Sequence, residues 1–194
     1  SEMCIRDRYK GKIVTEATFA SGDKDYQSAL TKFKDLDYDA IVMPGYYTET
    51  GIITKQARDL GIDKPILGPD GFSDAKFTEL AGKKNASNVY YVSGYSTNVS
   101  LSDKASGFIE AYKKAYKTEP NMFAALAYDS VYMIAEASKD AKTSVDIADN
   151  LAHLKNFVGV TGKMTIDKDH NPIKAALMAV SYTHLRAHET LSDL

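Results

Sequence analysis

The chain has 194 residues, and its 24 basic and 26 acidic side chains give a formal charge of −2. Hydrophobic residues make up 44% and charged residues 26%, which is ordinary for a globular protein, and no apolar run approaches the ~20 residues that span a bilayer. The balanced charge argues against a nucleic-acid binder with a basic face. The single cysteine, Cys4, excludes an intrachain disulfide framework and a zinc site built on cysteines.

The two ends of the chain do not continue the patterns beside them. Residues 1–8 (SEMCIRDR) and 181–194 (SYTHLRAHETLSDL) resemble translated sequencing adapter, so we expect both to be non-native tails. Excluding the tails from the native protein also excludes Cys4 and the histidine pair His184 and His188, whose i, i+4 spacing would otherwise suggest half a zinc site. What is left has no signal peptide and no initiator methionine, and we expect it to be an interior fragment of a longer protein.

Short apolar strands alternate with amphipathic helices in the first half of the chain. Strands are expected at residues 12–19, 39–43, 65–67 and 88–93, and helices at residues 26–36, 48–60 and 74–80. In the second helix the side chains expected to point inward are Ile52, Ile53, Gln56, Ala57 and Leu60, and Gly61 suits the C-terminal cap. Phe72 and Phe77 are spaced for a hydrophobic staple. The alternation predicts parallel strands with helices on both faces of the sheet, and such sheets bind ligands outside the carboxyl ends of their strands.

The pattern changes after this first half. A polar linker is expected at residues 94–102, helices at 103–116, 123–139 and 144–154, and the strands of a hairpin at 162–166 and 175–180, across a turn at 167–172. The helical period places four side chains of the middle helix inward, namely Ala127, Val131, Ile134 and Ala135. Helices and one hairpin cannot close a sheet of this kind. We therefore expect an α/β protein with one nearly complete, doubly wound parallel-sheet lobe at residues 9–93 and an incomplete second lobe at residues 94–180.

Three residues are candidates for contact with a ligand. Asp70 lies in a Gly-Pro-Asp-Gly turn at a strand tip, where it either suits a tight turn or holds a cationic group by charge-assisted hydrogen bonds. Tyr46, at another strand tip, either packs on the start of the next helix or forms the wall of an apolar pocket. Phe123, before the alanine-rich helix, is either a core residue or a ligand wall. The residues alone leave both alternatives open at each position.

Patterns for catalysis and for metal binding fail on inspection. Residues 167–171 resemble the start of a calcium loop, but Pro172 replaces the required glycine and Met178 stands where the bidentate glutamate should fall. A polar hairpin turn explains this segment better. The chain has no phosphate loop with the right spacing and no nucleophile elbow, and His153 and His170 have no obvious acidic or nucleophilic partner. We expect no catalytic residue, no metal and no cofactor.

Residues 9–180 resemble the extracytoplasmic solute-binding proteins of ABC importers for branched-chain amino acids, of the leucine/isoleucine/valine-binding type. The segments that carry the resemblance are EATFASGDKDYQSALTKFK (16–34), DAIVMPGYYTETGIITKQARDLGI (39–62), PILGPDGFSD (65–74) and EPNMFAALAYDSVYMIAEA (119–137). The resemblance implies a type I periplasmic-binding fold, which is a two-lobed clamshell that closes on a ligand between its lobes. It also implies that residues 9–93 form most of lobe two and that the helices after residue 94 return to lobe one.

The resemblance also implies a role for each candidate residue. Tyr46 would supply an aromatic wall, and Asp70 would grip the α-ammonium group of the ligand, with aspartate as a shorter variant of the glutamate frequent in this family. Phe123 would face the pocket for the ligand side chain. The groups that hold the α-carboxylate would belong to the N-terminal part of lobe one, outside this chain.

The implied function is that of a non-catalytic, monomeric binding component of an importer. Its ligand would be an amino acid of the Leu/Ile/Val class and its partner an ABC permease in the membrane. It would bind no nucleic acid, and it would act outside the cytoplasm, in the periplasm or as a lipoprotein on a Gram-positive cell. One alternative keeps the fold in a ligand-sensing regulator or receptor domain. A flavodoxin-like enzyme is a third hypothesis, for which the sequence offers no nucleophile, metal cluster or phosphate loop.

Overall fold

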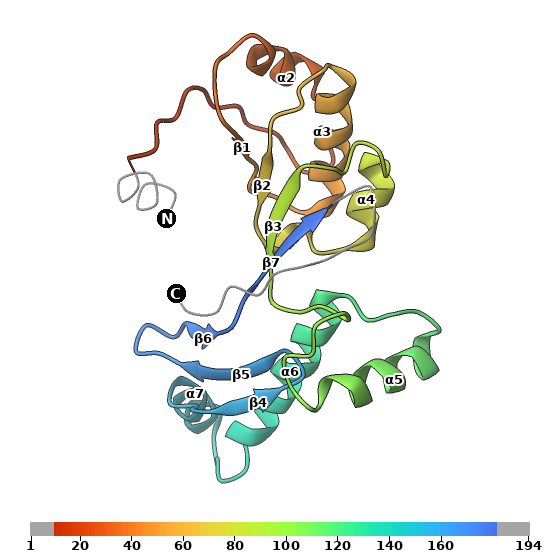
Figure 1. The fold of residues 1–194 in the computed structure, drawn as a ribbon. Coiled ribbons are helices and arrows are strands. Elements are labelled where there is room, and N and C mark those ends of the chain that lie inside the picture. Colours follow the sequence, from red (N-terminus) through yellow and green to blue (C-terminus); the bar gives the residue numbers. More distant parts are fainter. Residues whose placement is uncertain (1–9, 182–194) are drawn as a thin grey trace. The chain divides into compact units, whose positions relative to one another are not determined.

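The computed structural model describes residues 10–181, which form two compact units (Figure 1). Unit one comprises residues 10–72, Lys76–Tyr90 and Ser181, and unit two comprises Ser73–Ala75 and Tyr91–Val180. Cys4, His184 and His188 lie outside the described residues, as do residues 1–8 and 182–194 of the expected tails. The boundary between lobes at residues 93 and 94 stays a prediction.

Unit one has the predicted alternation of strands and helices. Its elements, with two that run on into unit two, are α2 (Gln27–Lys34), β1 (Ile41–Val42), α3 (Tyr47–Asp59), β2 (Ile66–Gly68), the 3₁₀ turn η1 (Asp70–Phe72), α4 (Ala75–Ala81) and β3 (Val89–Ser93). β1 and β2 are parallel, with Ile41 opposite Ile66 and Val42 opposite Leu67. The parallel pair that the sequence predicted is therefore confirmed.

The core of unit one forms where the apolar side chains of these elements meet. Ile53 and Ala57 of α3 are buried as predicted, and Gly61 has a φ of +80°, which ends the helix in a conformation that favours glycine. The rings of Phe72 and Phe77 are both buried and stack with centroids 4.9 Å apart. This contact fixes the chain entering α4, as the predicted hydrophobic staple requires.

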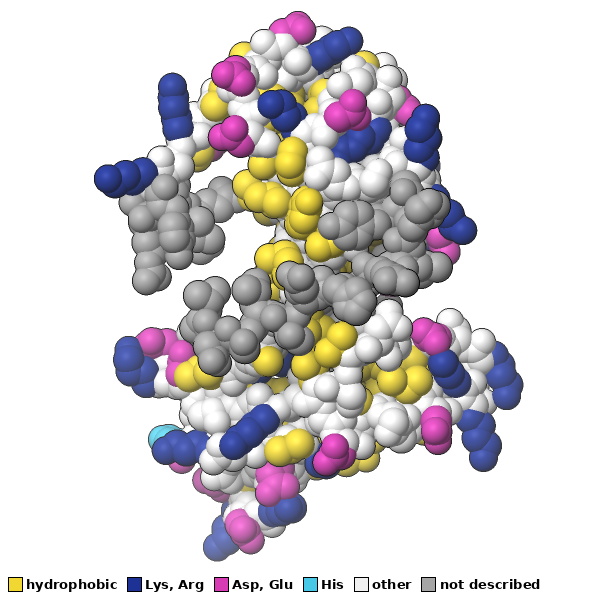
Figure 2. All heavy atoms as spheres, viewed as in Figure 1, with side chains coloured by type: hydrophobic (Ala, Val, Ile, Leu, Met, Phe, Trp, Pro, Cys, Tyr) yellow, Lys and Arg dark blue, Asp and Glu magenta, His cyan; other side chains and the backbone are white. Residues whose placement is uncertain are grey.

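One side of the β1–β2 pair is buried and the other is uncovered. Ile41 and Ile66 point to the buried side, whereas Val42 is 65% exposed and Leu67 is 38% exposed. Figure 2 shows hydrophobic side chains gathered over this part of the sheet. Parallel sheets are usually covered on both faces, so this bare face is unusual for the fold class.

Residues 12–19 were predicted as a strand, and the prediction was wrong. They form no strand in the structure, and Ile13 and Val14 are about half exposed. A strand is held by ladder hydrogen bonds to a neighbour, and the β-branched residues of this segment supply strand propensity without supplying a partner. In the four-stranded sheet the order is β1-β2-β3-β7, which leaves β1 at the edge.

Unit two contains three helices and an antiparallel sheet. The helices are α5 (Ala105–Tyr116), α6 (Met122–Ala137) and α7 (Ser144–Ala152), and the remaining strands are β4 (Phe157–Gly159), β5 (Gly162–Ile166), β6 (Pro172–Lys174) and β7 (Leu177–Ser181). The antiparallel sheet has the order β4-β5-β6. All three helices were predicted, whereas β4 was missed because three residues are too short for a periodic signal.

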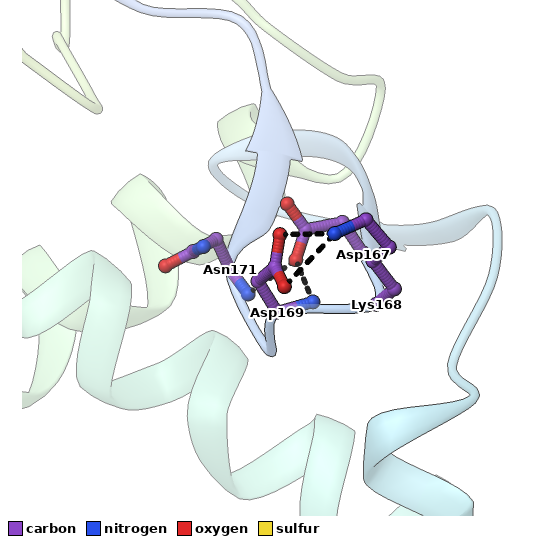
Figure 3. Close-up of polar contacts among 4 residues, drawn as sticks. All are labelled: Asp167, Lys168, Asp169 and Asn171. Carbon is purple, nitrogen blue, oxygen red and sulfur yellow. Dashed lines mark hydrogen bonds and ion pairs between the residues drawn. The ribbon is translucent and has the colours of Figure 1, made fainter.

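The second strand of the predicted hairpin was misplaced. β6 pairs with β5, with Pro172 opposite Ile166 and Lys174 opposite Met164, whereas residues 177–180 of the predicted strand belong to β7 of the other sheet. The tight turn explains the shift, because it closes the hairpin at residue 171. The Asp167 carboxylate accepts hydrogen bonds of 2.8 Å from two turn amides, and Lys168 pairs with Asp169 (Figure 3). The segment is thus the polar turn that the sequence favoured.

The inward face predicted for α6 was wrong. Val131 is 65% exposed and Ile134 is 50% exposed, and Ala127 and Ala135 are exposed as well. The buried positions are Met122, Ala125, Asp129 and Ala137. The helical pattern predicts that an aspartate faces water, whereas Asp129 lies on the buried face of this helix.

Asp129 of α6 is only 2% exposed because it holds the β4–β5 turn. Its carboxylate accepts hydrogen bonds from the Val160 amide at 2.7 Å, the Thr161 amide at 2.9 Å and the Thr161 hydroxyl at 2.6 Å. The Lys174 ammonium lies 2.6 Å from the same hydroxyl; burial lowers the pKa of Lys174, and the nearby Asp129 charge opposes that shift. A fully hydrogen-bonded buried carboxylate is compatible with a stable core.

Candidate ligand-binding site

Asp70 lies directly after β2, in the turn η1. The Phe72 amide donates to the carbonyl of Pro69 at 3.3 Å, so the segment is the tight turn that one alternative predicted. The Asp70 side chain is exposed, and its carboxylate makes no hydrogen bond or ion pair with any of residues 10–181. The turn therefore presents an accessible negative charge beyond the carboxyl end of a parallel strand, where ligands bind in α/β sheets.

Tyr46 follows β1 and occupies the N-cap position of α3. Its carbonyl accepts hydrogen bonds from the Thr50 amide at 3.1 Å and from the Thr50 hydroxyl at 2.8 Å. These bonds fix the backbone of Tyr46, while the residue stays 65% exposed. The tyrosine is thus held at the strand tip and keeps a large part of its surface available for contact.

Gly45 lies where three segments of unit one meet. A Cβ atom added at Gly71 would lie 2.4 Å from the Gly45 carbonyl oxygen and 3.3 Å from Cδ1 of Tyr46, so η1 packs directly on the tip that carries Tyr46. A Cβ atom added at Gly45 would lie 3.0 Å from Cζ of Phe19, so the segment before loop 20–23 is adjacent too. The structure therefore brings Tyr46 and Asp70 to one edge of unit one, as the strand-tip argument predicted.

Substitution of Gly71 by alanine is expected to destabilise unit one by about 1–3 kcal/mol, since 2.4 Å is far inside contact distance and the backbone must move. Urea denaturation followed by circular dichroism measures the loss. The matched control is Gly107→Ala in α5, where nothing lies within 4 Å of the new methyl group; this change should be neutral or stabilising by up to ~1 kcal/mol. Equal stability of the two variants would contradict the close packing of η1 on Gly45.

Sequence reasoning missed Glu49, which joins loop 20–23 to the same edge. Its carboxylate accepts hydrogen bonds from the Ser21 hydroxyl at 3.1 Å, from the Gly22 amide at 3.0 Å and from the Thr48 hydroxyl. The hydrogen bond from Thr48, followed by the one from Gly22, lowers the pKa of Glu49. An acidic residue in the first turn of a helix was the available signal.

Phe123 belongs to unit two, in the first turn of α6. The side chain of Asn121 caps this helix by accepting a hydrogen bond of 2.9 Å from the Ala124 amide. Phe123 is partly buried against a cluster made by Tyr95, Phe108, Met122, Ala125 and Val160. The structure thus supports its role in the core of unit two, and its role as a ligand wall stays a prediction.

Comparison with known proteins was informative over nearly the whole chain. The sequence model of a family described as "Periplasmic binding protein" matches residues 7–182. The chain belongs to this family.

Two solved binding proteins are similar to this chain in sequence and structure. One is LivJ from Streptococcus pneumoniae, a branched-chain amino acid transporter substrate binding protein that was solved in complex with isoleucine. It is 52% identical to this chain with a TM-score of 0.83, and the alignment covers 94% of this chain and 52% of LivJ. The leucine binding protein LivK from Thermotoga maritima is 27% identical with a TM-score of 0.86, covering 97% and 54%. These similarities confirm the predicted type I periplasmic-binding fold.

A curated relative in Pseudomonas aeruginosa is described as a leucine-, isoleucine-, valine-, threonine- and alanine-binding protein. It is 26% identical over 130 residues, which is 67% of this chain and 34% of the relative. The chain thus spans about half the length of the two solved relatives and about a third of this curated one.

Proposed function

We propose that this protein is the substrate-binding component of an ABC importer and that it holds a branched-chain or similar small apolar amino acid between two lobes. The observation that carries the proposal is the accessible Asp70 carboxylate beside Tyr46, on one edge of unit one. The relatives support it, because the LivJ protein, which is 52% identical to this chain over the aligned residues, was solved in complex with isoleucine.

The chemistry of a zwitterionic amino acid suits these residues. Its ammonium group needs an anion, which Asp70 supplies through charge-assisted hydrogen bonds. Its apolar side chain needs walls, for which we propose Tyr46 in unit one and Phe123 in unit two. Its carboxylate needs donors, which we place in the part of the relatives' length that this chain does not span. An uncharged ligand would leave Asp70 without a partner in a closed site, which is costly.

We assign a binding role without catalysis, without a cofactor and without nucleic acid. The relatives are described as binding proteins of transporters, which favours import over the sensor or receptor alternative. We propose that the protein acts outside the cytoplasm as a monomer and delivers its ligand to a membrane permease. No helix among residues 10–181 has the length and apolar character to cross a bilayer.

Isothermal calorimetry on a form of the protein that carries both lobes tests this function. We expect micromolar or tighter binding of isoleucine, leucine or valine, and loss of binding for 3-methylpentanoate, which keeps the side chain and carboxylate of isoleucine but lacks the ammonium group. The 194-residue chain serves as the control, and we expect no micromolar binding by it. Equal affinity for isoleucine and 3-methylpentanoate would contradict the role of Asp70 and the amino-acid assignment.

A further inference from the structure

Two side chains on one face of α3 bind the segment that precedes α2. Glu49 in the first turn accepts hydrogen bonds from Ser21 and Gly22, as described above. Gln56 lies seven residues further along, which is two helical turns, so both side chains point to the same side of the helix. Together they attach residues 20–26 to α3 at two separate points.

The Gln56 attachment holds the far end of this segment. Its side-chain oxygen accepts a hydrogen bond of 2.7 Å from the Tyr26 amide, and its side-chain nitrogen donates one of 2.8 Å to the Lys24 carbonyl. The buried Tyr26 ring also meets the Phe19 ring edge-on, with centroids 6.0 Å apart. The segment therefore stays on α3 through Gln56 and these rings, whether or not Glu49 is present.

Glu49 binds the tip of loop 20–23 to α3. Within the loop, the Asp23 carboxylate accepts a hydrogen bond of 3.0 Å from the Ala20 amide, which makes the loop a closed turn. The tip residues Ser21 and Gly22 are attached to the helix by Glu49, three residues after Tyr46. The loop thus meets α3 at the end that carries Tyr46, and Phe19 at its base packs on Gly45.

We propose that Glu49 is a positioning residue of the ligand site, which holds loop 20–23 as a third wall beside Tyr46 and Asp70. The inference rests on the proposed function, because the wall matters only if a ligand binds at this edge. Glu49 acts through the loop and does not itself contact the ligand in this proposal. The loop tip, released from the helix, would sample several conformations, and ligand binding would have to select one of them.

Two measurements on three variants test the proposal. Amide hydrogen exchange on the 194-residue chain should be about fivefold faster at Gly22 in Glu49→Ala, as loss of a modest hydrogen bond requires. In the two-lobed form, the same variant should bind isoleucine about fivefold more weakly, because the loop must be ordered on binding. Glu49→Gln keeps an oxygen acceptor and should recover most of both effects. Glu79→Ala, which removes an exposed glutamate from α4, is the matched control and should change neither quantity.

The outcomes separate this inference from the proposed function. Unchanged exchange at Gly22 in Glu49→Ala would overturn the inference, even with isoleucine bound normally. Faster exchange with unchanged affinity would also overturn it, because the loop would then be attached to the helix without forming a wall. Absence of isoleucine binding by the unsubstituted two-lobed protein would instead overturn the proposed function, and the positioning role would fall with it.

Discussion

Replacement of Asp70 by alanine is expected to weaken isoleucine binding by about 30-fold or more in the two-lobed protein, since a desolvated charge contact worth more than ~2 kcal/mol is lost. The structure leaves this carboxylate exposed in unit one. The contact becomes buried only when the ligand is enclosed. Calorimetry with isoleucine measures the loss directly.

Two further substitutions sharpen this result. Asp70→Glu keeps the charge on a longer side chain and should retain most of the affinity, whereas Asp70→Asn keeps the size without the charge and should not. Asp59→Ala removes an equal charge from unit one, where Asp59 pairs with Lys55 at 2.6 Å on the exposed side of α3, and should leave affinity unchanged. Unchanged affinity in Asp70→Ala would show that another group holds the ammonium.

Replacement of Asp129 by alanine is expected to destabilise unit two by about 3 kcal/mol, because two buried amides, those of Val160 and Thr161, lose their acceptor. The Lys174 ammonium nearby also loses a compensating charge. Gly159 adds to the constraint, since its backbone approaches the Asp129 carboxylate so closely that a Cβ atom there would lie 2.3 Å away. Amide exchange along α6 under native conditions reports the stability of this unit separately from unit one.

Asp149→Ala in α7 is the control for the Asp129 experiment. Asp149 lies 3.4 Å from His153 with both side chains largely exposed, so its removal should cost less than ~1 kcal/mol. Asp129→Asn keeps one oxygen acceptor and should fall between alanine and the unsubstituted chain. A cost for Asp129→Ala no larger than that for Asp149→Ala would show that the β4–β5 turn is held by other contacts.

Those elements of the fold that depend on neighbouring residues were predictable from the sequence. The helix α3 was predicted from the spacing of its apolar residues and from Gly61, and the stacking of Phe72 on Phe77 follows from their spacing. Features that depend on distant partners were not predictable. Residues 12–19 have strand-forming side chains and no paired neighbour in the structure, and residues 175–180 lead into a strand of a different sheet.

The buried face of α6 could not be predicted either, and Asp129 shows why. This buried face includes Asp129, whose hydrogen-bond partners lie 31 and 32 residues away in the chain. A prediction from periodicity assumes that every aspartate side chain faces water, and no local sequence pattern distinguishes a buried aspartate from an exposed one. The buried face of α6 therefore includes a polar residue that the spacing of its apolar residues could not indicate.

The candidate site likewise has features that the sequence predicts and features that it does not. The shared edge of Tyr46 and Asp70 was predictable because both follow parallel strands, and the carboxyl ends of neighbouring parallel strands lie at one edge. Glu49 was missed because its partners Ser21 and Gly22 are 28 and 27 residues away, and nothing in the local sequence couples them. The place of Phe123 in α6 was predicted to within a residue, while its part in ligand binding stays a prediction.

Val42 of β1 and Leu67 of β2 form an exposed apolar surface, which affects the solubility of the chain. β1 ends the sheet order, so an apolar surface adjoins an edge strand, the combination from which aggregates grow. Concentrated samples will therefore need a solubilising change, and lysine at Val42 is a suitable gatekeeper, because Val42 lies within the strand whereas Tyr46 and Asp70 lie beyond the strand tips.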